Sequence, residues 1–179
     1  MKDEALAARC RALRLVLTDV DGVLTDGTFL LLPDGREAKP FHIRDGLGMV
    51  LAQRAGLRLG LLSGRASESV AARARELGLE VVRQGVSDKA AAFEEILREQ
   101  GLRAQEVAYM GDDLNDLAVL TRAGLSAAPA DAPFEVRAQA FMVTDAPGGR
   151  GCFREFLEAI LRARGEWESL LAGIGAALP

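Results

Sequence analysis

The fold is decided by the stretch LRLVLTDVDGVLTDG, residues 13–27, in which an apolar run leads directly into two aspartates one residue apart. Alternate side chains of an extended chain point to the same side, so Asp19 and Asp21 can both reach one point at the end of a strand before Gly22 turns the chain. Two carboxylates held that close repel each other, and a cation is the usual remedy. The stretch therefore predicts a strand-end site suited to metal-assisted chemistry on a phosphate.

The composition is that of an ordinary soluble globular protein. The 179 residues fit one domain, residues 1–179, and 49% of them are hydrophobic and 27% charged. A net charge of −4 argues against nucleic acid or an anionic membrane as a partner. The N-terminus lacks a signal-peptide core and no apolar run approaches the ~20 residues that span a bilayer, so a cytoplasmic location is expected. Two cysteines and one histidine are too few for a disulfide framework and make a zinc site improbable.

Short apolar runs alternate with helical patterns along the chain. The expected strands are residues 13–17, 57–62, 81–82, 107–110, 125–127 and 141–143. The expected helices are residues 46–54, 67–77, 88–100, 115–122 and 151–164. Ser67 is expected to cap its helix, and Gly78, Gly101 and Gly124 are expected at left-handed C-terminal positions. The alternation predicts an α/β fold, a Rossmann-like three-layer α/β/α arrangement with a mainly parallel sheet.

Residues 28–43 break the alternation and predict a β-hairpin inserted directly after the carboxylate loop. Its apolar residues, Leu30, Leu31 and Leu32, need a covering surface, either the protein's own sheet or another subunit. We favour another subunit, because uncovered apolar ribbons invite pairing. The segment between Asp21 and Ser63 is too short for a separate cap domain. The apolar tail, residues 165–179, is expected to be packed or exchanged between subunits.

Polar clusters follow four of the predicted elements, where ligands bind in open α/β sheets. Besides the first aspartate pair, the clusters are Ser63-Gly64-Arg65, Lys89, and the acidic run from Asp112 through Asp113 to Asp116. Alone, a strand-end aspartate is commonly a helix cap and a first-turn lysine is commonly a solvated surface residue. Together they indicate a phosphate site. Hydroxyl and backbone N–H groups of the second cluster can bind phosphate oxygens, and an anionic partner would explain a cation in the first turn of a helix.

The acidic clusters also indicate a metal. Carboxylate oxygens of Asp19 and Asp112, with the backbone carbonyl of Asp21, are hard ligands that suit Mg²⁺. Magnesium keeps bound waters and accepts a substrate phosphate oxygen. Mg²⁺ is therefore the expected cofactor.

With these motifs in order, the chain resembles the haloacid dehalogenase superfamily of phosphatases over nearly its whole length. The motifs are Asp19-Val20-Asp21, Ser63, Lys89 and Gly111-Asp112-Asp113. Ser63 stands where many relatives have threonine, which keeps the hydroxyl. The resemblance implies Mg²⁺-dependent hydrolysis through an aspartyl-phosphate, in a homotetramer whose active sites are closed by a neighbouring subunit.

The resemblance and the chemistry together give each residue a role. Asp19 would attack phosphorus and bind the metal, and Asp21 would protonate the leaving oxygen and then deprotonate the attacking water. Ser63 and Lys89 would hold the phosphoryl oxygens as charge develops. Asp112 would bind the metal directly, with Asp113 or Asp116 supporting it.

The narrower resemblance is to phosphatases of sugar-acid phosphates, through residues 19–27, 41–46, 63–65, 111–114 and 148–151. It points to an eight-carbon sugar acid, and a phosphatase for nine-carbon sialic-acid-type phosphates is the alternative; Arg65 favours the first. Substrate binding is expected from Gly64, and Arg44, Arg65 and Arg150 are candidates for the carboxylate of the sugar acid, because guanidinium binds carboxylate bidentately. Surface charge or structural pairing is the competing interpretation of these arginines.

Two further interpretations come from other classes of protein. A signalling receiver domain also combines acidic pairs with a lysine, but receivers place adjacent acids on the first strand and the phosphoacceptor on a later one. Here Val20 separates the first pair, and the later cluster reads Gly-Asp-Asp. A noncatalytic relative is the other interpretation, and the presence of all four motifs speaks against it. His42 is expected to be a packed hairpin residue, and Cys10 and Cys152 are expected to fill space.

Overall fold

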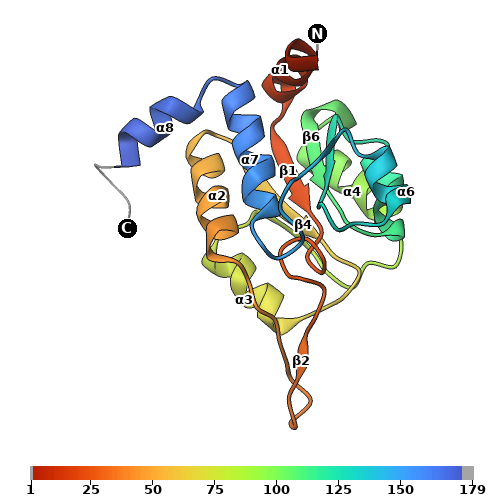
Figure 1. The fold of residues 1–179 in the computed structure, drawn as a ribbon. Helices are drawn as coiled ribbons and strands as arrows, with labels where there is room; N and C mark the ends of the chain where they lie inside the picture. The colour runs from red at the N-terminus through yellow and green to blue at the C-terminus, as the bar shows by residue number, and fades with distance from the viewer. Residues whose placement is uncertain (1, 175–179) are drawn as a thin grey trace.

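The computed structural model describes residues 2–174 and contains one parallel six-stranded sheet in the order β5-β4-β1-β6-β7-β8 (Figure 1). The strands are β1 Leu15–Thr18, β4 Arg58–Leu62, β5 Val81–Arg83, β6 Val107–Met110, β7 Leu125–Ala128 and β8 Met142–Val143. Every pairing within this sheet is parallel, with β1 in register between β4 and β6. The predicted α/β fold with a mainly parallel sheet is confirmed.

Helices pack on both faces of this sheet. They are α1 Lys2–Ala12, α2 Ile43–Arg54, α3 Glu68–Glu76, α4 Lys89–Gln100, α5 Leu117–Leu120, α6 Phe134–Gln139, α7 Cys152–Ala163 and α8 Trp167–Ile174, with short 3₁₀ turns η1 Ala104–Glu106 and η2 Leu114–Asp116. The five expected helices are present, whereas α1 and α6 were not predicted. The tail forms α8, whose Trp167 is buried, and its last five residues, 175–179, lie outside the described residues.

Two apolar cores result from the alternation of side chains along the strands. Val16 of β1 belongs to the core that includes residues of α2, α3 and α7, while its neighbours Leu15 and Leu17 belong to the core with α4, α5 and α6. Phe153 and Phe156 of α7 are fully buried in the first core. Because β1 is apolar on both faces, it occupies the centre of the sheet, and its C-terminal end is the centre of that edge.

The ends of the helices agree with the sequence in part. Gly78 and Gly101 have φ of +61° and +62°, the left-handed conformation predicted for them. Gly124 is not left-handed, contrary to the prediction; a Cβ atom there would lie 2.3 Å from the carbonyl oxygen of Gln105, so glycine permits close backbone contact instead. Ser67 occupies the N-cap position of α3, but its hydroxyl makes no capping hydrogen bond.

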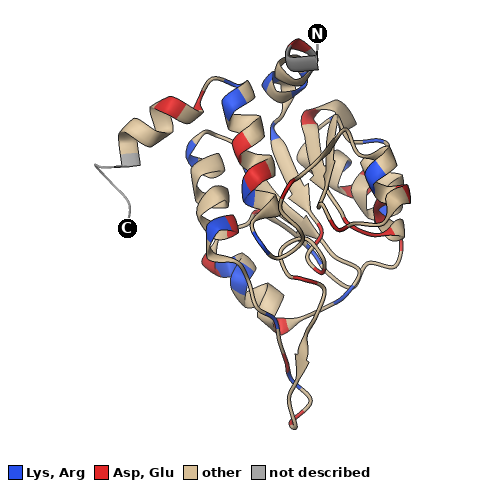
Figure 2. Cartoon of the chain, in the orientation of Figure 1, with Lys and Arg blue, Asp and Glu red and all other residues tan. Residues whose placement is uncertain are grey.

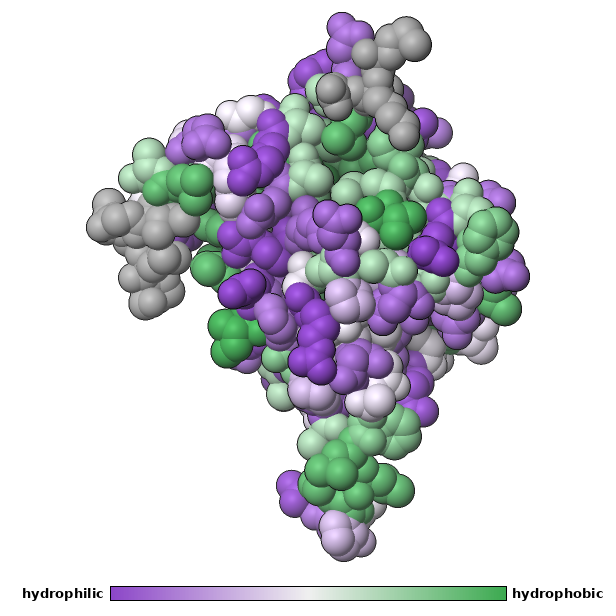
Figure 3. All heavy atoms as spheres, in the orientation of Figure 1, coloured by the Kyte–Doolittle hydropathy of each residue, from purple (hydrophilic) through white to green (hydrophobic). Residues whose placement is uncertain are grey.

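The predicted hairpin consists of β2, Leu30–Leu31, and β3, Glu37–Ala38, paired antiparallel. It projects from the body of the molecule at the bottom of Figure 1. Phe29, Leu30 and Leu31 are 44%, 63% and 66% exposed. Figure 3 shows the hairpin as an apolar projection with a more polar end. The hairpin's own sheet does not cover them.

Basic and acidic residues are interspersed over the helices in the view of Figure 2. Within residues 2–174, no helix combines the length and the apolar character needed to cross a bilayer. Cys10 and Cys152 are buried free thiols, and burial raises the pKa of Cys10 to about 11, which suits a space-filling role.

Candidate active site

The carboxyl ends of adjacent strands bring the predicted motifs to one edge of the sheet. Asp19 follows β1, Ser63 follows β4, Asp112 lies two residues beyond β6, and Lys89 begins α4 after β5. A cavity of about 140 Å³ lies at this edge, lined by Asp19, Asp21, Ser63, Gly64, Arg65, Asp112, Asp113 and Asn115. The order of strands around β1 therefore assembles residues that are far apart in the sequence.

Gly22 permits this close assembly. Its φ is +90°, and a Cβ atom there would lie 1.9 Å from Oδ2 of Asp112. Any other residue would therefore strain the turn and push Asp112 away from the loop that follows β1. Gly148 lies on the other side of this loop, where an added Cβ atom would lie 2.0 Å from the carbonyl oxygen of Gly22.

Lys89 is buried between two carboxylates. Its Nζ lies 2.8 Å from Oδ2 of Asp19 and donates a hydrogen bond of 2.6 Å to Oδ1 of Asp116. Burial opposes the charged form, but the two carboxylates outweigh it and raise the pKa of Lys89. The anionic partners explain why a cation is tolerated in the first turn of α4, which excludes the solvated-surface interpretation.

Asp116 is an organising residue, because both of its oxygens already accept hydrogen bonds. Oδ1 accepts from Lys89 and from the hydroxyl of Tyr109, and Oδ2 accepts from the backbone N–H groups of Asp112 and Asp113 at 3.0 and 3.2 Å. Tyr109 was not predicted as a site residue, because an aromatic residue in a buried strand is typically part of the hydrophobic core. Burial and the neighbouring carboxylates raise its pKa, which keeps it a hydrogen-bond donor. Asp116 thus fixes the loop that carries Asp112.

The same carboxylates fit a divalent cation. Oxygens of Asp19, Asp112 and Asp116 lie within 4.8 Å of one another, and Oδ1 of Asp112 is buried with no hydrogen-bond partner among the described residues. The pKa of Asp112 is raised to about 8 by burial and by the nearby charges of Asp19 and Asp116. The pKa of Asp19 is raised to about 6 by burial and by Asp116. The single positive charge of Lys89 does not neutralise the negative charges of the three carboxylates. Four donors engage the two oxygens of Asp116, whereas each oxygen of Asp19 has one partner and Oδ1 of Asp112 has none, so Asp19 and Asp112 are the better candidates to hold a divalent cation. The backbone carbonyl of Asp21 as a ligand, and the exposed Asp113, which caps η2, as a supporting residue, remain predictions.

The raised pKa values predict how metal affinity depends on pH. Protons compete with Mg²⁺ for Asp19 and Asp112 below their pKa values of about 6 and 8, so affinity rises as the pH increases through this range. Calorimetric titration is expected to show a dissociation constant for Mg²⁺ lower by about tenfold or more at pH 8.5 than at pH 6. The same affinity at both pH values would contradict this assignment, and Asp112→Asn should remove most of the difference.

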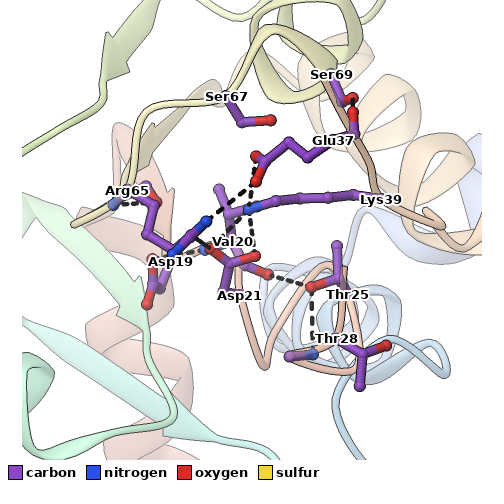
Figure 4. Close-up of polar contacts among 12 residues, drawn as sticks. Asp19, Val20, Asp21, Thr25, Thr28, Glu37, Lys39, Arg65, Ser67 and Ser69 are labelled. Atoms are coloured by element: carbon purple, nitrogen blue, oxygen red, sulfur yellow. Dashed lines mark hydrogen bonds and ion pairs between the residues drawn. The ribbon is translucent and has the colours of Figure 1, made fainter. Parts of the chain in front are cut away.

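Asp21 lies beside Asp19 but is held by a different group. Lys39, at the base of the hairpin, donates from Nζ to both carboxylate oxygens of Asp21, at 2.6 and 2.8 Å (Figure 4). Glu37 lies 3.7 Å from the same Nζ and forms an ion pair of 3.0 Å with Arg65. The hairpin therefore contributes Glu37 of β3 and the following Lys39 to the site of its own chain. The expectation that another subunit covers its apolar residues remains a prediction.

Ser63 and Arg65 lie at the edge of the cavity. The buried hydroxyl of Ser63 accepts a hydrogen bond of 3.4 Å from the backbone N–H of Arg65. The guanidinium of Arg65 stacks 4.5 Å from the ring of Phe29 and its Nε lies 3.8 Å from Asp21. About half of the Arg65 side chain is exposed, so it can contact a ligand at the mouth of the cavity.

Arg44 and Arg150 lie apart from this cavity. They line a groove of about 510 Å³ at the N-terminal ends of α2 and α7, together with Arg154. Arg150 lies 4.0 Å from Asp26, on the loop that packs against Gly22. Neither Arg44 nor Arg150 lines the cavity around Asp19, so a role for them in substrate binding requires a ligand that extends beyond it.

Comparison with known proteins decides the family. The family model of the haloacid dehalogenase-like hydrolases matches residues 52–151. The chain belongs to this family. The resemblance stated from the motifs is confirmed, and the protein is a phosphatase.

Relatives match over most of the chain. It is 39% identical over 154 residues to the 3-deoxy-D-manno-octulosonate 8-phosphate phosphatase of Haemophilus influenzae, covering 86% of each chain. The crystal structure of a probable YrbI family phosphatase from Pseudomonas syringae superposes with a TM-score of 0.93 at 40% identity, covering 98% of this chain and 99% of that one. That of the 3-deoxy-D-manno-octulosonate 8-phosphate phosphatase from Moraxella catarrhalis, in complex with magnesium, phosphate and KDO, gives a TM-score of 0.91 at 34% identity, covering 93% and 96%.

Proposed function

We propose that this phosphatase hydrolyses 3-deoxy-D-manno-octulosonate 8-phosphate to the free sugar acid and phosphate, with Mg²⁺ as cofactor. One observation carries the chemistry: Asp19, Asp112 and Ser63 line one small cavity at the end of β1, and the buried Lys89 lies 2.8 Å from Asp19. The substrate is supported by the names of the relatives from Haemophilus influenzae and Moraxella catarrhalis. Magnesium is supported by the surplus of buried carboxylate and by the ion bound in the second of these relatives.

In this proposal Asp19 is the nucleophile. Its Oδ1 accepts a hydrogen bond of 2.7 Å from the N–H of Val20, and its Oδ2 lies 2.8 Å from Lys89, so both oxygens have fixed directions. Each carboxylate oxygen retains a free lone pair with which to attack phosphorus. Covalent catalysis of this kind divides one difficult displacement into two easier ones.

The neighbouring residues serve the two displacements. In the first, Asp21 gives its proton to the departing sugar oxygen while Asp19 bonds to phosphorus; in the second, Asp21 takes a proton from the water that displaces Asp19. Lys89 and the hydroxyl of Ser63 stabilise charge on the phosphoryl oxygens. When bound to Asp19 and Asp112, Mg²⁺ supplies charge neutralisation for phosphate and carboxylate.

A phosphate-release screen tests the function. We expect rapid Mg²⁺-dependent release from 3-deoxy-D-manno-octulosonate 8-phosphate, and much slower release from the nine-carbon sialic-acid-type 9-phosphate and from simple hexose phosphates. Arg65 is the residue on which the carboxylate preference is expected to depend, because it is the arginine at the mouth of the cavity. Faster turnover of the nine-carbon compound would establish the alternative substrate, and equal weak turnover of both would refute both assignments.

We also propose that the protein is a homotetramer in which a neighbouring subunit closes the active site, as the family resemblance implies. The exposed hairpin tip, Phe29, Leu30 and Leu31, supports a second copy as its covering surface, since a ribbon this apolar is unusual on a monomer. The small cavity is open to solvent in the single chain, and closure would exclude water from the reaction.

Light scattering tests the assembly at micromolar concentration. Parent protein is expected at four times the chain mass, and Leu31→Glu is expected to shift it to smaller species and to reduce turnover, because a buried charge disrupts an apolar interface. Phe134→Glu, at an exposed aromatic on α6, is the matched control and should remain tetrameric. A parent protein that is only monomeric would overturn the proposal.

A further inference from the structure

Lys39 is the most completely buried cation that contacts the site from outside the four motifs. Its side chain is 0% exposed, and its Nζ reaches both oxygens of Asp21 at 2.6 and 2.8 Å. A buried ammonium group is costly unless it is paired and hydrogen-bonded, so this contact fixes the positions of both partners. Figure 4 shows the lysine extending from the hairpin across to the loop that follows β1.

The lysine is itself held in place by the hairpin. The backbone carbonyl of Glu37 accepts a hydrogen bond of 2.9 Å from Ser69 of α3, and the carboxylate of Glu37 pairs with Arg65. These contacts join β3 to the segment that runs from the end of β4 into α3. Lys39 therefore approaches Asp21 from a backbone position directly after β3, a strand that these contacts hold in place.

Asp21 has little else to orient its carboxyl group. The other cation nearby, Arg65, lies 3.8 Å away, beyond hydrogen-bond distance. Without Lys39 the side chain could rotate between staggered rotamers, whereas proton transfer requires the oxygen within hydrogen-bond reach of the reacting atom. Orientation is the contribution that this geometry can make to catalysis.

We propose that Lys39 is a positioning residue that holds the carboxyl group of Asp21 in the orientation needed for both proton transfers; this rests on the proposed function. In the first step the proton moves from Asp21 to the sugar oxygen as its bond to phosphorus breaks. In the second it moves from water to Asp21 as water oxygen bonds to phosphorus and the bond to Asp19 breaks. Lys39 gives up no proton in either step; it donates a hydrogen bond to whichever oxygen of Asp21 is not reacting.

The test compares Lys39→Met and Lys39→Arg in the parent and in Asp21→Asn. With 3-deoxy-D-manno-octulosonate 8-phosphate and saturating Mg²⁺, Lys39→Met is expected to lower kcat by about tenfold or more with KM nearly unchanged, and Lys39→Arg to recover part of the loss. In the Asp21→Asn background, Lys39→Met should change the rate by less than about twofold, because the group it positions is gone. A merely structural role would lower activity equally in both backgrounds, which would overturn the proposal.

A second substrate keeps the test decisive if Asp21→Asn is too slow to measure. 4-Nitrophenyl phosphate has a leaving group that needs no proton, so its kcat/KM should fall much less in Lys39→Met than that of the sugar phosphate. Equal losses on both substrates would contradict positioning.

Arg103→Met removes an exposed positive charge and should behave as the parent does, and thermal melting shows whether each variant is folded. A parent inactive on every phosphomonoester would refute the proposed function; an active parent with an unaffected Lys39→Met would refute only this inference.

Discussion

Replacing Asp19 by asparagine is expected to lower Mg²⁺-dependent phosphate release by about 10³-fold or more, because the variant lacks the nucleophile and one metal ligand. The amide keeps the shape of the side chain, but its single oxygen can accept from only one of Val20 and Lys89, which contact different oxygens of Asp19. Steady-state kinetics with the sugar phosphate measures the loss.

Stability separates this loss from unfolding. The fold raises the pKa of Asp19 to about 6, chiefly through burial, so ionised Asp19 destabilises the metal-free protein above that pH. Asp19→Asn removes this charge, and its melting temperature at pH 8 without metal should equal or exceed that of the parent. Asp145→Asn, at an exposed carboxylate, is the matched control and should keep full activity. Activity of Asp19→Asn near the parent's would exclude Asp19 as the nucleophile.

Lys89→Met is expected to have the largest effect on stability. It leaves Asp19 and Asp116 facing each other in the protein interior with no cation between them, and removing one partner of a buried ion pair costs about 3–5 kcal/mol. Phosphate release should also fall by about 10²-fold or more, because the cation beside the phosphoryl group is lost.

The pH dependence of this loss has a definite sign. Asp19 and Asp112 have pKa values raised to about 6 and 8, so the stability they contribute is present at low pH and is lost as the pH rises through these values. Without Lys89 their ionisation becomes still less favourable. Urea unfolding without metal should therefore show a larger loss at pH 8 than at pH 5. A smaller loss at pH 8, or a loss below about 1 kcal/mol, would contradict the account, and Arg122→Met, at an exposed ion pair with Glu94, is the control.

The sequence was sufficient where local pattern and chain order determine position. Asp19, Ser63 and Asp112 follow apolar runs, and parallel strands end at a common edge, so their convergence could be predicted without coordinates. Lys89 could be predicted as well, because a cation in the first turn of a helix needs an anionic partner. The buried anions proved to be Asp19 and Asp116.

The features that the sequence did not reveal depend on contacts between distant segments. Lys39 directly follows a strand of two residues, and the sequence pattern there gives no sign that the lysine contacts Asp21. Tyr109 reads as core, and its hydroxyl acquires a role only because Asp116 turns toward it. Gly124 follows a helix in the sequence, as a helix-ending glycine does. Glycine is needed there for another reason, because the backbone of Gln105, in another element, approaches it closely.

Helices α1 and α6 were missed for a different reason. α1 mixes charged and apolar residues without a clear apolar face, and α6 has only 6 residues, too few to show a helical period. Packing against the rest of the protein stabilises such elements more than their own sequence does.

Chemical trapping during turnover tests the central claim most directly. Enzyme quenched in acid while hydrolysing 3-deoxy-D-manno-octulosonate 8-phosphate with Mg²⁺, then reduced with borohydride, should carry homoserine in place of aspartate at position 19, because borohydride reduces an acyl phosphate to the alcohol. Peptide mass spectrometry detects the change, which should be missing when either the substrate or Mg²⁺ is left out. An unmodified Asp19 in enzyme that is turning over and trapped efficiently, or homoserine at another aspartate, would contradict the account.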